Sequence, residues 1–142
     1  MSSSRQNVRE AAFLLLFEKL LRDDPLEEIF KAAKEVDDFA FNADAEELVR
    51  RVDSKKDELD EIVAMFSNKR AVSRIPRVNL TVLRIAIYEA MYDERVPVNV
   101  AISEAVRLTQ MYALEPDVSF VNGVLGSFSK SEYVNNKEED MQ

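Results

Sequence analysis

Glycine and proline, the residues that most often interrupt helices, are scarce in this chain. Its 142 residues contain two glycines, at positions 123 and 126, and four prolines, at positions 25, 76, 97 and 116. Long stretches without such residues favour helices. Nowhere do apolar and polar residues alternate beside turn signals in the way that predicts a strand. The sequence therefore predicts an all-α fold.

The spacing of apolar residues predicts where the helices lie. Asp24 is placed to cap the second helix, and Asn42 or Asp44 to cap the third. We interpret residues 42–66 as one long helix, with a break near Asp53–Ser54 as the alternative. The other expected helices cover about residues 5–22, 25–39, 78–93, 99–113 and 117–131.

The segment 78–93 is apolar nearly all round, which predicts a helix enclosed by others. Arg84 and Glu89 fall within it, and buried charges need partners, for which Glu104 is a candidate. We therefore expect structural roles for both. Asn122 and Gly123 are also interpreted as structural, because a glycine inside a helix is best explained by the close approach of a neighbouring helix.

Apolar residues make up 46% of the chain, enough for one compact domain or two small subdomains. Between residues 67 and 77 the helical periodicity is lost, and the stretch includes Ile75–Pro76, where the residue before proline is pushed out of the helical region. This predicts an N-terminal subdomain of three helices at 1–67 and a C-terminal subdomain at 68–131. The polar tail at 132–142 is predicted to be disordered.

Several function classes are disfavoured by the composition. The chain has no cysteine and no histidine, so it lacks thiolate chemistry, the commonest metal ligand and the side chain most used for proton transfer near neutral pH. We predict no enzyme, metal, cofactor or small-molecule substrate. The longest apolar run, residues 11–17, is far shorter than the ~20 residues that span a bilayer. We expect no membrane anchor or signal peptide, and a cytoplasmic location.

Positive charge is concentrated in one segment of an acidic chain. The net charge is −8, yet residues 67–84 contain Lys69, Arg70, Arg74, Arg77 and Arg84 and no acidic residue. One interpretation is a solvated connector that satisfies neighbouring helix ends, and the other is a contact with a polyanion. A few cations and exposed rings suffice for a single-stranded nucleic acid, so Arg70 and Arg74 are candidate RNA-binding residues.

Four segments together resemble a known family. They occur in order across about residues 5–130: REAAFLLLF at 9–17, VLRIAIYE at 82–89, VPVNVAISEAV at 96–106 and FVNGVLG at 120–126. In sequence and spacing they are similar to the NusB family of bacterial transcription antitermination factors.

The resemblance implies a fold of two three-helix subdomains packed together. It also implies a function: a factor that binds the boxA element of single-stranded RNA together with NusE, a small-subunit ribosomal protein. Such a factor acts within the RNA polymerase antitermination complex and promotes ribosomal RNA transcription. The alternative is a helical protein-binding adaptor of the same fold with little affinity for RNA.

The resemblance also suggests RNA-binding residues, namely Arg5, Arg9, Phe17 and Phe120. A phenylalanine ring can stack on any base. Packing in the core is the alternative for both rings, and an ordinary first-turn role is the alternative for Arg9. Gln6 and Ser119 stand where the family commonly has cations, which implies weaker and less salt-sensitive RNA binding.

For the protein partner, the resemblance points to the start of the central helix. The family commonly has an acidic residue at the position of Asn79. Asparagine caps helices well, so we expect Asn79 to begin this helix without the electrostatic contact. The predicted partner-binding patch is Ile75, Asn79 and Val82.

Overall fold

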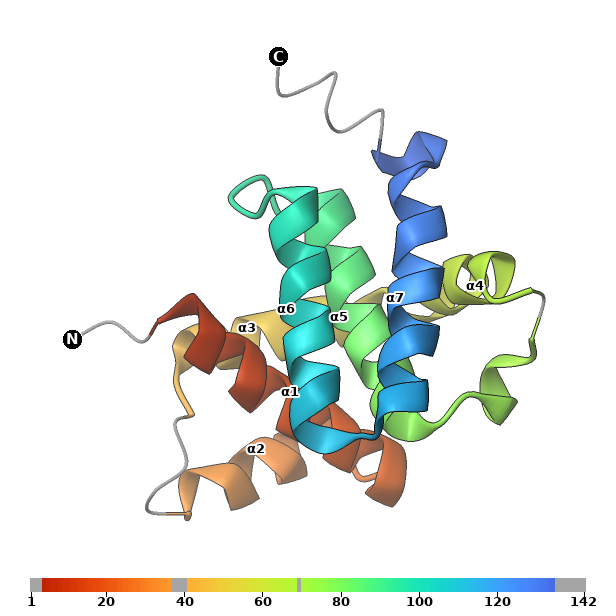
Figure 1. Cartoon of the computed structure of the whole chain (residues 1–142). Helices are drawn as coiled ribbons and strands as arrows, with labels where there is room; N and C mark the ends of the chain where they lie inside the picture. Colours follow the sequence, from red (N-terminus) through yellow and green to blue (C-terminus); the bar gives the residue numbers. More distant parts are fainter. Residues whose placement is uncertain (1–3, 37–40, 69, 135–142) are drawn as a thin grey trace. The chain divides into compact units, whose positions relative to one another are not determined.

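The computed structural model describes residues 4–36, 41–68 and 70–134. Every regular element in these ranges is helical, which confirms the all-α class (Figure 1). The chain forms two compact units, Met1–Ser54 and Lys55–Gln142, each described by itself below. The elements are α1 (Arg5–Arg22), α2 (Leu26–Lys34), α3 (Ala43–Ser54), α4 (Lys56–Phe66), the 3₁₀ turn η1 (Val72–Arg74), α5 (Arg77–Tyr92), α6 (Val98–Tyr112) and α7 (Glu115–Ser129).

In the first unit, α1 packs against both α2 and α3. Its start is capped by the Ser4 hydroxyl, which accepts a hydrogen bond from the Asn7 amide at 3.1 Å, and the predicted range 5–22 is confirmed. Apolar side chains of all three helices form the core of the unit. The largest that are fully buried are Phe13, Leu15, Ile29 and Phe30.

Helix α2 is shorter than predicted. It ends at Lys34, and its N-cap position is occupied by Pro25 without a side-chain hydrogen bond, so the expected cap by Asp24 is wrong. Asp24 instead pairs with Arg22 at 2.6 Å. The last buried residue of the helix is Ala33, whereas Val36 is exposed. Continuing the helix past Lys34 would therefore not bury the Val36 side chain, and helices in proteins are stabilised mainly by such packing. The predicted end at Phe39 lies outside the described residues.

The expected long helix over residues 42–66 is two helices, as the alternative anticipated. Asn42 caps α3, since its side-chain oxygen accepts a hydrogen bond from the Ala45 amide at 2.9 Å. At the other end of α3, the Ser54 hydroxyl donates to the carbonyl of Arg51 at 2.8 Å. Lys55 separates the two helices and supplies no side-chain cap to α4.

This break coincides with the division between the two units. We expected the division after residue 67, but α4 packs against α5 and α7 and so belongs to the second unit. Leu59, Ile62 and Val63 are its buried residues. The lost periodicity after residue 67 therefore marks a connection within the second unit.

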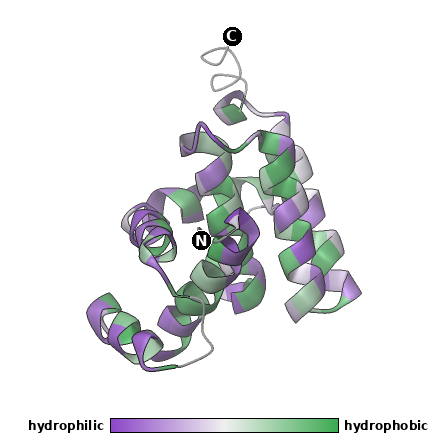
Figure 2. Cartoon of the chain, turned by 90° about the vertical axis from the view of Figure 1, so that its left-hand side faces the viewer, coloured by the Kyte–Doolittle hydropathy of each residue, from purple (hydrophilic) through white to green (hydrophobic). Residues whose placement is uncertain are grey.

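Helix α5 is the central element of the second unit, with contacts to α4, α6 and α7. It is buried nearly all round, as its apolar sequence predicted. The flanking helices show the banding of hydrophobic and hydrophilic residues expected of helices that bury one face (Figure 2). On α6, Ala101, Ala105 and Leu108 are buried, but Tyr112 at its end is exposed.

Two charged side chains of this core, Arg84 and Glu104, pair with oppositely charged side chains. Arg84 donates two hydrogen bonds of 2.7 Å to the carboxylate of Asp60 on α4. Glu104, which the sequence suggested as a partner, accepts hydrogen bonds from Arg107 on its own helix. Glu89 is buried, at 1% exposure. The ion pair between Arg84 and Asp60 thus joins α5 to α4.

The first residues of the tail that was predicted to be disordered, 132–134, are instead packed on the second unit. The ring of Tyr133 stacks on Phe128 with 6.4 Å between centroids, and Val134 is buried. Residues 135–142 lie outside the described part. Within the described ranges no helix combines the length and apolarity needed to cross a bilayer, and no cluster of acidic residues is arranged to hold a metal ion.

Candidate nucleic-acid interface

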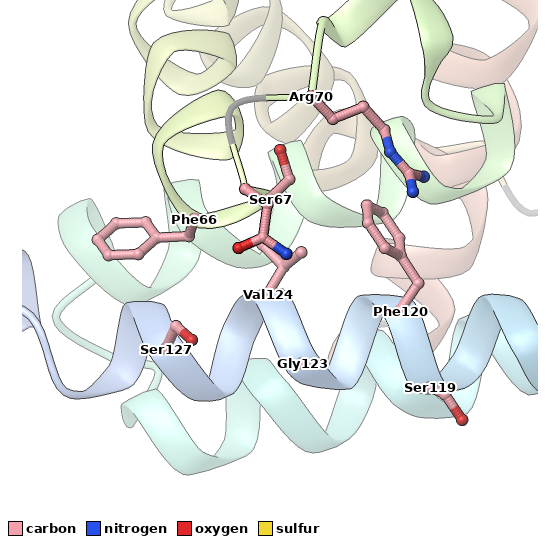
Figure 3. A pocket seen from close by; sticks show the side chains of 9 residues that line it. Phe66, Ser67, Arg70, Ser119, Phe120, Gly123, Val124 and Ser127 are labelled. Carbon is pink, nitrogen blue, oxygen red and sulfur yellow. The ribbon is translucent and has the colours of Figure 1, made fainter.

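A pocket of about 450 Å³ opens between the end of α4 and one face of α7. All of its lining residues belong to the second unit (Figure 3). They are Phe66, Ser67, Asn68, Arg70, Ser119, Phe120, Gly123, Val124 and Ser127. The lining contains two aromatic rings, one cation, several small residues and no acid.

The end of α4 shapes one wall of the pocket. Phe66 packs edge-on against Phe128 of α7, with centroids 6.0 Å apart, which holds the two helices together there. Asn68 adopts a left-handed conformation, with φ of 58°, a conformation that asparagine tolerates better than most residues. The Arg70 amide then donates to the Ser67 carbonyl at 3.2 Å, which closes the turn.

This turn brings Arg70 over Phe120. The guanidinium carbon lies 4.9 Å from the centre of the ring, a cation–π contact that joins two of the residues proposed for RNA binding (Figure 3). Arg70 is exposed, while Phe120 is partly buried. A base that reaches this ring therefore meets a stacking surface and a positive charge together.

Three arginines of this region lie exposed near the pocket or after it along the chain. In the described ranges, no acidic side chain lies within ion-pair distance of Arg70, Arg74 or Arg77, all of which are exposed. Most other arginines of the chain do have carboxylate partners, as Arg84 does. Cations without internal partners are available to phosphates, the groups that dominate affinity for nucleic acids.

The other wall of the pocket is a face of α7 with small side chains. Ser119, Gly123 and Ser127 follow one another at four-residue spacing and so lie on the same side of the helix (Figure 3). The expected close approach of a helix to Gly123 is wrong, because a Cβ built there meets no atom within 4 Å. Asn122 is exposed, so its expected structural role has no support in its surroundings.

The first turn of α7, just before Phe120, is anchored to α5. The side-chain amide of Asn79 donates to Asp117 at 3.0 Å, and the second oxygen of Asp117 accepts from the Leu114 amide at 3.4 Å. Pro116 lies within this turn. Asn79 therefore helps to fix the start of α7, the helix that carries Phe120.

The predicted partner-binding patch does not form a surface. Ile75, Asn79 and Val82 are exposed by only 4%, 1% and 1% respectively. The prediction that Asn79 caps α5 is also wrong, because Pro76 occupies the N-cap position. The helical register of α5 turns Asn79 and Val82 inward, and Ile75, in the extended segment before the helix, is buried as well. The sequence alone did not show this because polar Asn79 resembles a cap.

The predicted N-terminal RNA-binding residues lie on α1, in the first unit. Arg9 is only 3% exposed, which leaves little of it for a phosphate. Arg5 is partly exposed. Phe17 is also partly exposed, and its ring stacks on Phe13 with 5.8 Å between centroids and 8° between planes. This contact supports the alternative interpretation, in which Phe17 packs in the core.

Several pocket residues were missed by sequence reasoning. Phe66 is only the last residue of the helix predicted over residues 42–66, and Ser67 falls in the segment that one interpretation treats as a connector. Ser119, Gly123 and Ser127 carried a usable signal in their four-residue spacing, which predicts a shallow face on a helix. Only the turn at Asn68 brings the other wall against that face.

The fold and the pocket define a class: an all-helical protein with a partly exposed aromatic ring beside an arginine that has no acidic partner in the described part of the chain. A family model described as NusB family matches residues 6–130. The chain belongs to the NusB family.

Similar proteins agree with this membership. The transcription antitermination protein NusB of Clostridium acetobutylicum is 34% identical over 131 residues, covering 90% of this chain and 96% of that protein. The NusB of Clostridium botulinum strain Alaska E43 is 37% identical over 135 residues, covering 89% and 98%.

Solved structures are similar along most of the chain. T. maritima NusB matches with a TM-score of 0.82 and 28% identity, covering 98% of this chain and 99% of that one. A crystal structure of the antitermination factors NusB and NusE in complex with dsRNA contains a chain that matches with a TM-score of 0.74 and 28% identity, covering 89% and 96%.

Proposed function

We propose that this protein is a transcription antitermination factor that binds boxA-type single-stranded RNA together with NusE and promotes ribosomal RNA transcription. The observation that carries the proposal is the pocket in which unpaired Arg70 lies 4.9 Å from the ring of Phe120. The names of the relatives, and a solved complex of NusB, NusE and dsRNA, support the same role.

A single strand suits the pocket better than a duplex. Stacked and paired bases expose only their edges, whereas an unpaired base can turn out and lie against an aromatic ring. The pocket volume of about 450 Å³ is within the range of small-ligand sites, ~300–1,000 Å³, and is large enough for a nucleobase with part of its ribose.

The exposed cations extend this site along the chain. Arg74 on η1 and Arg77 at the start of α5 follow Arg70 without acidic partners in the described part of the chain. They would contact phosphates, which set affinity, while the ring of Phe120 contacts a base. The role is a cytoplasmic one, within the RNA polymerase antitermination complex, and requires no cofactor.

The contact with NusE is proposed without the patch that the sequence suggested. Because Ile75, Asn79 and Val82 are buried, other residues must form that contact. Contributions of Arg5 and Phe17, which are partly exposed, to RNA binding remain part of the proposal.

A second candidate is a helical adaptor that binds protein and has little affinity for RNA. The burial of Arg9 and the polar residues Gln6 and Ser119, at positions where the family commonly has cations, favour it. Fewer accessible cations mean fewer phosphate contacts.

A titration separates the two candidates. Fluorescently labelled boxA-type RNA and a scrambled RNA are titrated with the protein, alone and with NusE, at two salt concentrations. Saturable binding that prefers boxA and weakens with salt supports the RNA-binding role. Binding to NusE without measurable binding of boxA-type RNA, alone or with NusE, supports the adaptor and contradicts our proposal.

A further inference from the structure

Neither the backbone conformation of Gly123 nor the contacts given for it explain why this residue is glycine. Glycine destabilises a helix interior relative to alanine, and is usually retained where the backbone needs a positive φ or where a neighbour comes close. Neither applies here, because no glycine of the described residues has a positive φ and no atom lies within 4 Å of a Cβ built on Gly123. The missing side chain leaves open space that belongs to the pocket.

The surroundings of that space are complementary to a nucleobase. Gly123 lies between Ser119 and Ser127 on the same face of α7, and Phe120 stands beside it under the guanidinium of Arg70 (Figure 3). The Ser127 hydroxyl can donate and accept hydrogen bonds, so it can pair with the edge of a base, whereas the Ser119 side chain points away from Phe120 in Figure 3. The Val124 side chain supplies apolar contact for its face.

We propose that Gly123 is the residue that admits a base: the slot over its backbone holds one unpaired nucleobase, stacked against Phe120 and beside Arg70. This inference rests on the proposed RNA-binding function and adds the position at which a base enters. A peptide side chain is the competing occupant. The lack of any acidic lining residue and the unpaired cation favour a polyanion.

Gly126 provides a matched control on the same helix. It too has no atom within 4 Å of a Cβ built on it, but it is not part of the pocket lining. Replacing either glycine by glutamine adds a good helix former and the same side chain. The variants Gly123→Gln and Gly126→Gln therefore differ in whether the new side chain enters the slot.

The experiment measures thermal unfolding, affinity for boxA-type RNA and affinity for NusE for the full-length protein and both variants. We expect both variants to unfold at or above the temperature of the parent. Gly123→Gln should bind RNA about tenfold or more weakly, the loss expected when one base no longer stacks, while Gly126→Gln stays within about twofold.

A second measurement identifies the base. RNAs with a single abasic position are compared along the boxA sequence. In the parent and in Gly126→Gln, one position should lose affinity when its base is removed. In Gly123→Gln the same removal should have little further effect, because the slot is already filled.

Three outcomes overturn the proposal. One is RNA affinity of Gly123→Gln equal to that of the parent while Phe120→Ala weakens binding, which would leave the proposed function intact. Another is an effect that is not specific to RNA binding by Gly123→Gln, seen either as an equal loss of RNA affinity in both glutamine variants or as a loss of NusE binding alone. The third is a parent protein without RNA affinity, which contradicts the proposed function itself.

Discussion

The two groups of residues that the sequence suggested for RNA binding differ in what the fold leaves accessible. On α1, Arg9 is 3% exposed and Phe17 stacks on Phe13. At the α4–α7 pocket, Arg70 is exposed and Phe120 borders open space. Both groups combine arginine with phenylalanine, so residue type alone does not separate them. Burial and pairing decide which group can meet a ligand.

The same contrast exists among the cations of residues 67–84, where Arg84 is paired. Replacing Asp60 by Asn leaves a largely buried guanidinium without its carboxylate, and we expect a loss of about 2–3 kcal/mol in the free energy of unfolding. Urea denaturation measures this loss. The control Glu47→Gln removes a carboxylate from an exposed pair with Arg51 and should change stability by less than about 0.5 kcal/mol. Equal effects would contradict the assignment of Arg84 as structural.

The rings provide the most direct test of the comparison. Phe120→Ala should weaken binding to boxA-type RNA by about 1–3 kcal/mol, or roughly 5- to 150-fold, because a stacking surface is lost. Phe17→Ala should lower the melting temperature, because it removes the contact with Phe13, and change RNA affinity less. Titration and circular dichroism are the measurements. A larger effect of Phe17→Ala on affinity, with unchanged melting, would reverse the comparison.

The cations are tested by salt dependence. Arg70→Gln and Arg74→Gln should each lower RNA affinity and reduce the slope of log K against log salt by about 0.7, the value for one phosphate contact of a single strand. Arg9→Gln should leave the slope unchanged and reduce stability, because Arg9 is buried. If only Arg9→Gln changes the slope, α1 and not the pocket holds the phosphates.

The smallest expected effect is on the pH dependence of stability, and it concerns the contact of Tyr92 with Glu58, two residues outside the pocket lining. Partial burial and a hydrogen bond to Glu58 raise the pKa of Tyr92 to about 12 from its ordinary value of 10.0. The folded state thus favours the protonated phenol. Its contribution is complete below pH 10 and is lost as the pH rises toward 12.

Tyr92→Phe should therefore flatten the fall in unfolding free energy across this window. Denaturation at several pH values, for the parent and the variant, measures it. Identical pH profiles of the two proteins would show that Tyr92 does not titrate differently on folding.

Much of the fold was predictable from local patterns. Scarce breakers and apolar periodicity predicted the helical class and the ranges of α1, α5, α6 and α7 to within about two residues. The ends of α2 and the break between α3 and α4 were less certain. Those boundaries depend on small differences between capping groups and on where burial ends, which neighbouring helices determine.

Less of the site was predictable. Phe120, Arg70 and Arg74 could be selected because an aromatic ring and a basic segment are visible in the sequence. Ile75, Asn79 and Val82 were misjudged as a surface, since a polar residue at a helix start suggests a cap. The pocket itself requires the left-handed turn at Asn68, which no residue pattern announced.

The sequence by itself determined the helical class and family of this protein and the absence of histidine and cysteine, because these depend on composition and on short-range spacing. Only the tertiary structure decided which charges are paired and which glycine lines the pocket. Ion pairing and burial depend on residues distant in the chain. Asp60 meets Arg84 only when α4 packs against α5, and Arg70 meets Phe120 only when the end of α4 packs against α7.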